Sequence, residues 1–198
     1  FPTRRSSDLF YISLHTADPG ETGTQTTSEA TYTSYARVAV ARSTAGWTVT
    51  GNSVSPVAAI GFGACTAGTA TASFFSVGTA GSGTGKILRM GVIGSRLGPI
   101  AGATSDTITI PGLSGLAVND RIAFLAVDGS ALPTGISEGT VYFVLTVSGD
   151  AITISTTQGG STLDITASGD ALAYRVTPIS ISAGVTPQLT TATAIIEE

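Results

Sequence analysis

Few residues in this chain have side chains that could do chemistry. His15 is the only histidine and Cys65 the only cysteine. Nucleophilic catalysis needs an activating base beside the Ser or Cys, and the chain has no G-x-S-x-G elbow. We therefore expect no catalytic residue. Cys65 is interpreted as a small buried residue, and one thiol forms no internal disulfide.

Metal binding is also disfavoured by the residue types present. Zinc sites require several Cys or His ligands, and this chain has one of each. Eight acidic residues lie in or beside predicted loops, where calcium could bind: Asp18, Glu21, Asp106, Asp120, Asp128, Asp150, Asp164 and Asp170. No D-x-D-x-D/N-G spacing links them, so we interpret them as turn-stabilising residues. We expect neither a metal ion nor a cofactor.

A glycine-rich segment, residues 78–86, invites comparison with a phosphate-binding loop. In the pattern G-x-x-x-x-G-K-S/T, Gly85 and Lys86 fit, but the first glycine falls on Ala80 and Ile87 replaces the hydroxyl residue. The segment also lies between two β-like runs, so no helix N-terminus is there to receive a phosphate. We predict a flexible hairpin loop.

Charge is scarce along the chain. Charged residues make up 11% of the sequence, against roughly 25% in an average soluble domain, and the net charge is −4. Beyond residues 1–9 there is no cluster of Lys and Arg, so we expect no nucleic-acid binding. No apolar run reaches the roughly 18 residues that cross a bilayer, so we expect no membrane insertion.

Hydrophobic alternation with a period of two predicts an all-β fold. Short strand-like runs recur between Gly, Pro and Asn-containing turns, a pattern typical of an antiparallel β-sandwich, here jelly-roll-like. The predicted strands are residues 10–14, 36–42, 47–49, 57–62, 71–77, 87–93, 106–110, 120–127, 140–147, 151–155, 163–166, 171–176, 179–181 and 192–196. On the strand 71–77, Phe74 and Phe75 point to opposite faces. At least one ring is therefore expected at the surface or in a partner, which favours oligomerisation.

The pattern changes near Arg96 and returns to its earlier composition after Pro178. We predict a nested organisation, with an outer domain formed by residues 10–95 and 177–198. Residues 96–176 form a small β-barrel or sandwich inserted in one of its loops, which costs little when the two ends of the guest lie close together. The alternative is a linear chain of two domains whose last strands belong to the second.

The first nine residues, FPTRRSSDL, resemble the translated read-through of a sequencing adapter, as found in assembled metagenomes. We expect this segment to be non-native, and scars of this kind are excluded before the fold is considered. The alternative is a native polar arm with two arginines.

Several segments carry a resemblance to a known family. They are Tyr11–Gly20, Tyr35–Val40, Trp47–Val49, Ala58–Phe62, Thr71–Gly78, Gly85–Leu88, Thr177–Pro187 and Ile195–Glu198. Together they resemble virion proteins of tailed bacteriophages that are usually labelled tail fibre proteins, with some related head-fibre or capsid-decoration proteins. Members of this family pass almost directly from the strand near Met90 to the segment near Thr177, which supports the nested insertion. Residues 120–144 separately resemble a small β-module that recurs in phage tail and surface proteins.

The resemblance implies a non-enzymatic structural protein of a virion, assembled in the host cytoplasm. Its expected partners are other virion proteins and further copies of itself, as a trimer by analogy with fibres. The alternative is a β-sandwich module that binds carbohydrate or protein at a bacterial or phage surface. Loops 16–34 and 80–85 would then hold a host glycan or receptor. A third hypothesis, a polysaccharide depolymerase, requires two carboxylates from different loops to meet in a cleft.

Overall fold

The computed structural model describes residues 8–127, 129–193 and 195–196; the expected non-native segment therefore lies, apart from residues 8 and 9, outside the described residues. No α-helix occurs in this part of the chain, and the strands pair antiparallel throughout. The prediction of an all-β antiparallel fold is confirmed. The chain divides into two compact units, unit 1 (Phe1–Gly91 with Pro178–Glu198) and unit 2 (Val92–Thr177). The interpretation of the second unit as an inserted module stays a prediction.

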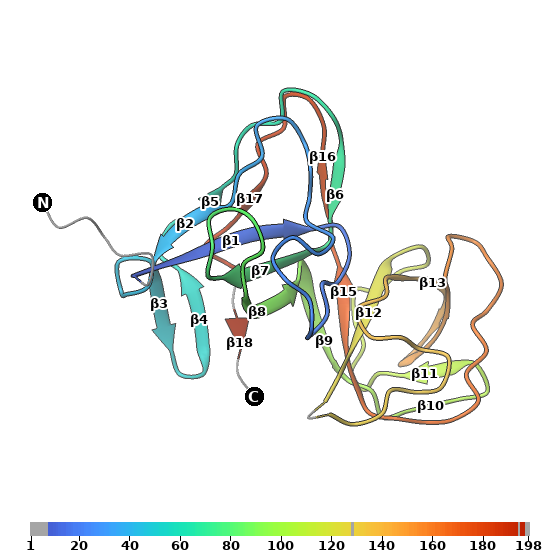
Figure 1. Cartoon of the computed structure of the whole chain (residues 1–198). Helices are drawn as coiled ribbons and strands as arrows, with labels where there is room; N and C mark the ends of the chain where they lie inside the picture. The colour runs from blue at the N-terminus through green and yellow to red at the C-terminus, as the bar shows by residue number, and fades with distance from the viewer. Residues whose placement is uncertain (1–7, 128, 194, 197–198) are drawn as a thin grey trace, which may run out of the picture. The chain divides into compact units, whose positions relative to one another are not determined.

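A four-stranded sheet in the order β2-β1-β7-β8 is the centre of unit 1 (Figure 1). Its strands are β1 (Leu9–His15), β2 (Val38–Ala41), β7 (Phe74–Gly78) and β8 (Ile87–Val92). β1 lies between β2 and β7, and the register places Leu14 opposite Phe75 and His15 opposite Phe74. Successive side chains of a strand point to opposite faces, so this register decides which side chains share a face.

Both faces of this sheet are covered. On one face, Ile12 and Phe75 pack with residues of the smaller sheets of unit 1. On the other face, His15 is covered by the loop 16–34, whose Thr27 carbonyl it contacts. Phe74 and Phe75 are consequently both buried, at 1% and 6% exposure. The expectation of an exposed or partner-covered ring at this position was wrong, because it assumed a sheet with one solvent face.

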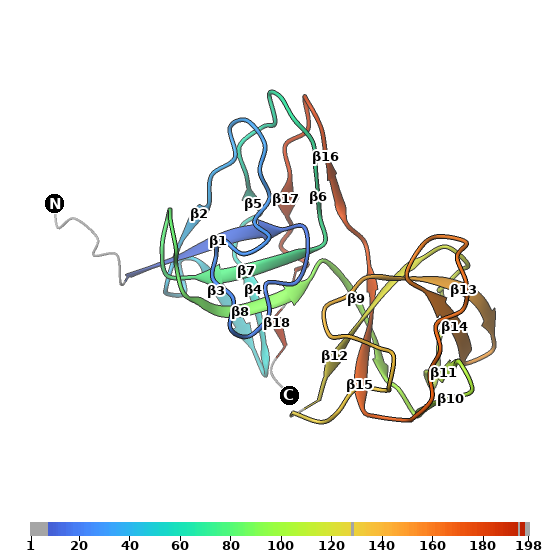
Figure 2. The same ribbon diagram turned by 45° about the vertical axis from the view of Figure 1, so that its right-hand side comes forward.

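Three small sheets complete unit 1. They are formed by β3 (Trp47–Thr50), β4 (Ser53–Pro56) and β18 (Ile195–Ile196); by β5 (Ile60–Gly61) and β17 (Gln188–Leu189); and by β6 (Ala70–Ala72) and β16 (Ile179–Ile181). The C-terminal segment therefore pairs with β6, β5 and β4 in turn, running back along the earlier chain in reverse order. Figures 1 and 2 show β16 beside β6 and β17 beside β5.

Unit 2 is built on one seven-stranded sheet in the order β10-β11-β14-β13-β12-β15-β9. Its strands are β9 (Gly94–Pro99), β10 (Gly102–Thr104), β11 (Thr107–Thr109), β12 (Arg121–Ala126), β13 (Tyr142–Ser148), β14 (Ala151–Ser155) and β15 (Ala171–Val176). The amide of Ile100 bonds to Ala171 and the amide of Ala101 bonds to Thr109, so the two ends of the sheet approach each other. The enclosed core contains fully buried Ile108, Ile122, Phe124, Val144, Ile152 and Ile154.

Three predicted strands differ from those observed. Residues 57–62 contain only β5, because the turn at Gly51-Asn52 brings Ser53–Pro56 back against β3 instead. The predicted strand 71–77 is two strands, interrupted at Ser73, whose amide bonds to the carbonyl of His15. Residues 163–166 form no strand; Ile165 is buried there, but its amide bonds to the Asp106 carboxylate. The amide of Leu163 bonds to the carbonyl of Ile154 in β14, and the carbonyl of Ile165 accepts the amide of Asp106, but these isolated bonds form no strand ladder.

Candidate functional site

A buried serine–histidine pair lies on one face of the central sheet of unit 1. His15 is the last residue of β1, and Ser76 lies in the middle of β7. His15 Nε2 is 2.9 Å from Ser76 Oγ, and Ser76 Oγ is 2.8 Å from Ser13 Oγ. Sequence reasoning missed this pair because 61 positions separate its members and no local motif marks it.

The hydrogen bonds around His15 run in one direction. Nδ1 lies 2.8 Å from the carbonyl oxygen of Thr27, which can only accept, so we place the proton on Nδ1. Nε2 then accepts from the Ser76 hydroxyl, and Ser76 Oγ accepts from the Ser13 hydroxyl. Ser13 Oγ in turn accepts from the Gln25 amide at 3.4 Å. His15, Ser76, Ser13 and Gln25 therefore form one continuous chain of hydrogen bonds, with His15 as the neutral imidazole.

The distance between His15 Nε2 and Ser76 Oγ is that of a catalytic base and its nucleophile. Unlike a catalytic pair, however, these two side chains cannot be reached by a substrate. His15, Ser76 and Ser13 are all 0% exposed, so substrate has no path to Ser76 Oγ in this conformation. Burial lowers the pKa of His15, and the hydrogen bond with Thr27 opposes only part of that shift. A backbone carbonyl, rather than a carboxylate, orients the imidazole. The network therefore fastens the loop 16–34 to the sheet.

A second buried polar cluster joins the same loop to the chain before β2. Arg37 Nε and Nη2 each lie 2.7 Å from one oxygen of the Glu29 carboxylate, and the two side chains are 3% and 15% exposed. Tyr35 donates its hydroxyl to Glu29 and accepts the amide of Leu14. The bond to Glu29 raises the pKa of Arg37, and burial raises the pKa of Tyr35. Such a two-point ion pair is geometrically specific and costly to break.

The structure brings together the two loops that the sequence suggested for ligand binding. Gln25, from the loop 16–34, accepts the amide of Ala80 with its side-chain oxygen at 2.9 Å. Its backbone amide bonds to the carbonyl of Gly85, also at 2.9 Å. Arg37 Nη1 donates to the carbonyl of Ala80. Loops 16–34 and 80–85 therefore form one continuous surface, which we call the joined loops.

The outer surface of the joined loops is made mainly of hydroxyl groups. Its exposed residues include Thr16, Thr22, Thr26, Ser28, Ser82 and Thr84. Tyr32, an aromatic residue of these loops, is buried and donates its hydroxyl to Gly63. The predicted hairpin loop at 78–86 is confirmed as a connection, since residues 79–86 join β7 to β8 and lead into no helix; its flexibility stays a prediction. Hydroxyl groups could bind a polar ligand, but aromatic stacking partners are missing from the described part of the joined loops.

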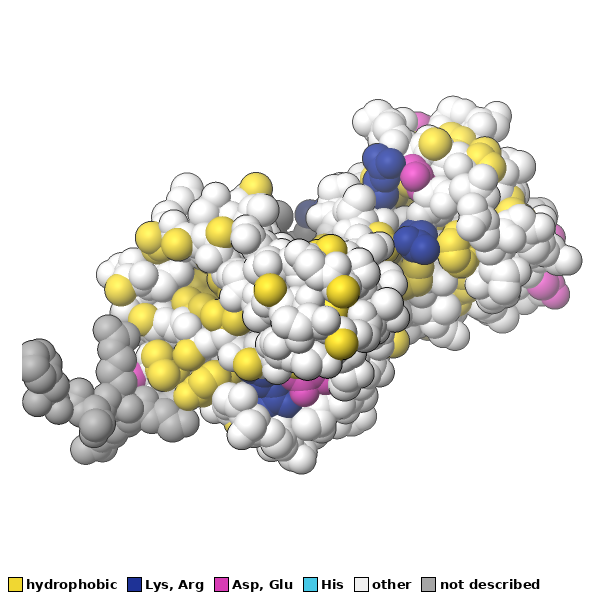
Figure 3. All heavy atoms as spheres, turned by 90° about the horizontal axis from the view of Figure 1, so that it is seen from above, with side chains coloured by type: hydrophobic (Ala, Val, Ile, Leu, Met, Phe, Trp, Pro, Cys, Tyr) yellow, Lys and Arg dark blue, Asp and Glu magenta, His cyan; other side chains and the backbone are white. Residues whose placement is uncertain are grey.

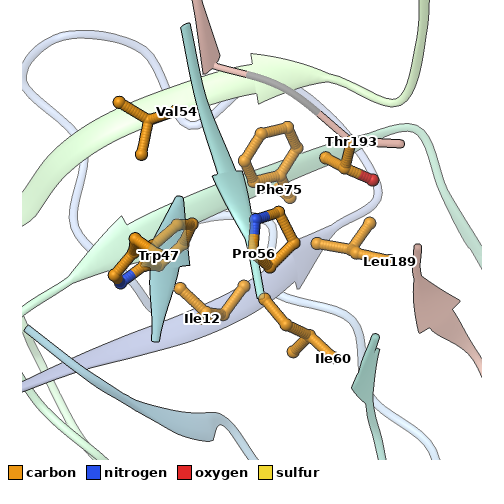
Figure 4. A pocket seen from close by; sticks show the side chains of 8 residues that line it. All are labelled: Ile12, Trp47, Val54, Pro56, Ile60, Phe75, Leu189 and Thr193. Carbon is orange, nitrogen blue, oxygen red and sulfur yellow. The ribbon is translucent and has the colours of Figure 1, made fainter. Parts of the chain in front are cut away.

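An apolar pocket lies on the opposite face of the central sheet (Figure 4). It is lined by Ile12, Trp47, Val54, Pro56, Ile60, Phe75, Leu189 and Thr193. Its free volume is about 10 Å³, roughly the space that one water molecule needs. The indole nitrogen of Trp47 is buried and has no hydrogen-bond partner among the described residues. The pocket is a packing defect between sheets and has no room for an organic ligand.

Carboxylates in the loops bind backbone amides. The acceptors and donors are Asp18 with Gly20, Asp106 with Ile165, Asp120 with Ala117, and Asp150 with Leu113. Asp18 and Asp120 bind their amides within a turn, as the turn-stabilising interpretation predicted. Asp106 and Asp150 instead bind amides 59 and 37 positions away, so they join distant segments. Asp128, another of the acidic residues considered, lies outside the described residues. Within the described ranges, no three His, Cys, Asp or Glu side chains form a group that could hold a metal ion.

Cys65 is 1% exposed, and its thiol approaches the carbonyls of Ala67 and Gly68 at 3.4 and 3.5 Å. The interpretation as a small buried residue is confirmed. A search of the described residues for a helix long and apolar enough to cross a membrane finds none.

Comparison with protein families finds a match over the first half of the chain. The model for podophage GP4 fiber I protein gp80 matches residues 5–111 of this 198-residue chain. The match includes β1 to β8 and both buried clusters, and extends past Gly91 into the second unit. Comparisons with curated proteins and with solved structures find no significant match. Because the family model covers more than half of its length, the chain belongs to the podophage GP4 fiber I protein gp80 family of phage fibre proteins.

Proposed function

We propose that the chain is a non-enzymatic structural component of a tailed-phage virion, placed at the tail as a fibre or on the head as a decoration. Membership in a phage fibre family carries this proposal and implies a virion location. Other virion proteins and further copies of the chain would be its partners. The insertion of unit 2 would add a second β-domain to the fibre's own domain.

The polar groups of unit 1 support a structural role. His15 and Ser76 bind each other in the core, and Glu29 and Arg37 bind each other beneath the loop surface. Groups that could catalyse are thus engaged in holding the loop 16–34 in place. Proteases cleave segments that unfold locally. Hydrogen-bond networks in which every group has a partner suppress such unfolding, which benefits a protein displayed in many copies outside the cell.

Electron microscopy of particles of the encoding phage tests this proposal. Antibodies against the purified chain, coupled to gold, are expected to label the tail, and mass spectrometry of purified particles should detect the chain. Gold on the capsid would identify a head decoration. Absence of the chain from particles in both measurements would overturn the proposal.

The joined loops favour a second function, attachment to a host-surface glycan. They present hydroxyl groups from two segments on one surface, held by Gln25 and Arg37. Alanine at Thr22, Thr26, Ser82 and Thr84 together should weaken binding of the fluorescent chain to host cells at least about tenfold. Alanine at Thr48 and Thr50, which are exposed elsewhere in unit 1, is the control. Unchanged binding by the fourfold variant would reject this second function.

A further inference from the structure

His15 is the only histidine, and its side chain is buried in unit 1. Accordingly, no cyan atom is visible on the face shown in Figure 3. The hydroxyl groups of Ser76 and Ser13, which we call the hydroxyl pair, connect its imidazole to the side-chain amide of Gln25. A group that can take up a proton near neutral pH is therefore connected to the side chain that contacts both of the joined loops.

The two ends of this connection fix the direction of its hydrogen bonds. At one end, the Thr27 carbonyl can only accept, so His15 Nδ1 donates to it. At the other end, the carbonyl of Tyr11 accepts from Gln25 Nε2, and the amide of Ala80 donates to Gln25 Oε1. Between these ends, Gln25 donates to the hydroxyl pair, and the hydroxyl pair donates to His15 Nε2. Each hydrogen of the connection then has an acceptor.

An added proton leaves the connection with more hydrogens than acceptors. Protonated Nε2 of His15 donates instead of accepting, so the hydroxyl pair receives hydrogen bonds from both sides. One hydroxyl hydrogen of the pair then has no acceptor, because among the described residues the pair bonds only to itself, His15 and Gln25. A donor left unpaired in the core loses its hydration without compensation.

Rotation of the Gln25 amide would remove this conflict. Its oxygen would then take the place of its nitrogen and accept the surplus hydrogen of Ser13. The rotated amide, however, would direct its oxygen at the carbonyl of Tyr11 and its NH2 group at the amide of Ala80. Neither arrangement can form a hydrogen bond, so the loop 80–85 would lose its 2.9 Å bond with Gln25.

The charged groups around His15 act in opposite directions on its protonation. Glu29 and Asp18, both in the loop 16–34, favour the charged imidazole, whereas Arg37 disfavours it. Tyr35 donates its hydroxyl to Glu29, and burial raises the pKa of Tyr35, so it stays neutral. Burial of the imidazole is the largest effect and lowers the pKa of His15 from its ordinary value of 6.5. The imidazole should therefore become charged only below that pH.

We propose that proton uptake by His15 releases Gln25 from the loop 80–85 and thereby loosens one of the joined loops against the other. The ion pair of Glu29 and Arg37 holds the loop 16–34 on the sheet in both states, so the change is local. This inference goes beyond the proposed function, because it makes the surface of the joined loops depend on pH whichever ligand meets that surface.

Nuclear magnetic resonance of the full-length, 15N-labelled chain between about pH 8 and pH 5 tests this switch. The His15 ring and the Ala80 amide are expected to change with the same midpoint. Hydrogen exchange of the Ala80 amide, corrected for the intrinsic effect of pH, should accelerate at least about tenfold relative to Ala30. The amide of Ala30 bonds to the carbonyl of Leu14, outside the connection, and is the internal reference.

Variants at both ends of the hydroxyl pair identify the route. His15→Gln cannot take up the proton, so its Ala80 amide should show no transition. Ser13→Ala removes the contact between the hydroxyl pair and Gln25, so the imidazole should still titrate while the Ala80 amide stays unchanged. Ser73→Ala, at a buried serine outside the connection, is the matched control and should respond like wild type.

An Ala80 amide that stays unchanged while His15 titrates would overturn the switch, as would a ring that stays neutral down to about pH 5. The same transition in His15→Gln would assign it to another group, and a full transition in Ser13→Ala would exclude the hydroxyl pair as the route; either result also overturns the switch. Trp47 fluorescence shows whether each variant keeps its fold, and wild type with His15→Gln decides if Ser13→Ala does not fold.

The switch and the proposed function fail separately. A chain found on virions whose joined loops ignore pH would leave the function standing and reject the switch. A chain with the expected response that is absent from virions would reject the function and leave the switch.

Discussion

Histidine often acts in catalysis, but the imidazole of His15 has a structural role in this protein. Its imidazole accepts from Ser76 and donates to the carbonyl of Thr27, and it has no exposed surface. The charged form would have to reverse the Ser76 hydrogen bond inside the core, close to Arg37. Glu29 and Asp18 favour that form, but burial outweighs them and lowers the pKa of His15.

This lowered pKa makes the stability of unit 1 depend on pH. The unfolded chain binds a proton on His15 below its ordinary pKa of about 6.5, whereas the folded chain binds it only at lower pH. The free energy of unfolding should therefore be constant just above pH 6.5. It should fall by up to about 1.4 kcal/mol per unit as the pH drops below that value. Urea unfolding followed by Trp47 fluorescence between pH 5 and 8 measures this slope.

The variant His15→Gln is the control for the pH effect, because it stays neutral and can still donate a hydrogen bond. It should be less stable than wild type at pH 7 but show a flatter dependence between pH 5 and 6.5. His15 is the only histidine, so an identical slope in both proteins would show that the imidazole does not titrate as described.

Arg37 should not tolerate replacement by lysine. Its guanidinium binds both Glu29 oxygens and the carbonyl of Ala80, and a lysine ammonium cannot make these three bonds from one position. We expect Arg37→Lys to lower the free energy of unfolding by about 3 kcal/mol. Arg42→Lys, at an exposed arginine whose guanidinium lies 5.2 Å from the Phe10 ring centroid, should cost less than about 1 kcal/mol. Equal losses would remove the special role given to the buried pair.

Cys65 and His15 are expected to be dispensable for infection. Phage carrying Cys65→Ala or His15→Ala should plaque as wild type at permissive temperature, with any defect explained by lower stability of the chain. Thermal unfolding of the purified variants supplies that comparison. Loss of infectivity in a variant that remains fully folded would indicate chemistry at that residue and contradict the non-enzymatic role.

At the scale of elements, one side chain joins the loop 16–34 both to the central sheet and to the loop 80–85. Gln25 is fully buried and contacts β1 through the carbonyl of Tyr11 as well as the loop 80–85. Its side chain fits because Gly78 and Gly85 carry no Cβ: an added Cβ would lie 2.1 Å from Gln25 at Gly78 and 2.0 Å from it at Gly85. The buried side-chain amide of Gln25 therefore joins the two predicted loops into one surface.

Gly78→Ala should therefore displace Gln25 and loosen the loop 16–34. We expect a loss of about 1–3 kcal/mol, as for overpacked cores, and faster amide hydrogen exchange at Gln25 and Thr27. Gly61→Ala is the matched control in strand β5, because its added Cβ would meet only Gln188 at 4.0 Å. Unchanged exchange in Gly78→Ala would show that Gln25 does not anchor the loop.

At the scale of the whole molecule, the two ends of unit 2 lie side by side. Gly94 of β9 pairs with Val176 of β15, and the amide of Thr177 bonds to the carbonyl of Ile93 at 2.8 Å. Neighbouring ends are what an inserted domain requires if its host is to close around it. The second unit also has a core of its own.

Replacing residues 92–177 by a short Gly-Ser linker should leave unit 1 folded. Trp47 lies in unit 1, so its fluorescence should show a cooperative unfolding transition within about 2 kcal/mol of the full-length chain. Residues 92–177 expressed alone should unfold cooperatively by circular dichroism. An unfolded linker variant would contradict the nested organisation and favour the linear one.

The strands predicted most accurately are those whose alternation is local and strong. The strands 151–155, 171–176 and 179–181 were predicted with their observed bounds, and those at 10–14 and 120–127 within one residue at each end. Weaker alternation misled at residues 57–62, where a turn replaces pairing. It also misled at residues 163–166, where one backbone bond to β14 and one to the Asp106 carboxylate stand in place of a strand ladder. β17 and β10 were missed because two or three residues are too few to show a period, and the longer β4 and β9 were missed as well.

By itself, the sequence determined the all-β class and the scarcity of charge, because period and composition are properties of neighbouring residues. It also determined the turns at Asp18 and Asp120, since each of these carboxylates binds an amide two or three positions away. Only the tertiary structure decided that Ser76 meets His15 and that Phe74 and Phe75 are both buried. It alone decided that Val49 is left exposed. These outcomes depend on strand order, register and the covering of both sheet faces, which are set by residues dozens of positions apart.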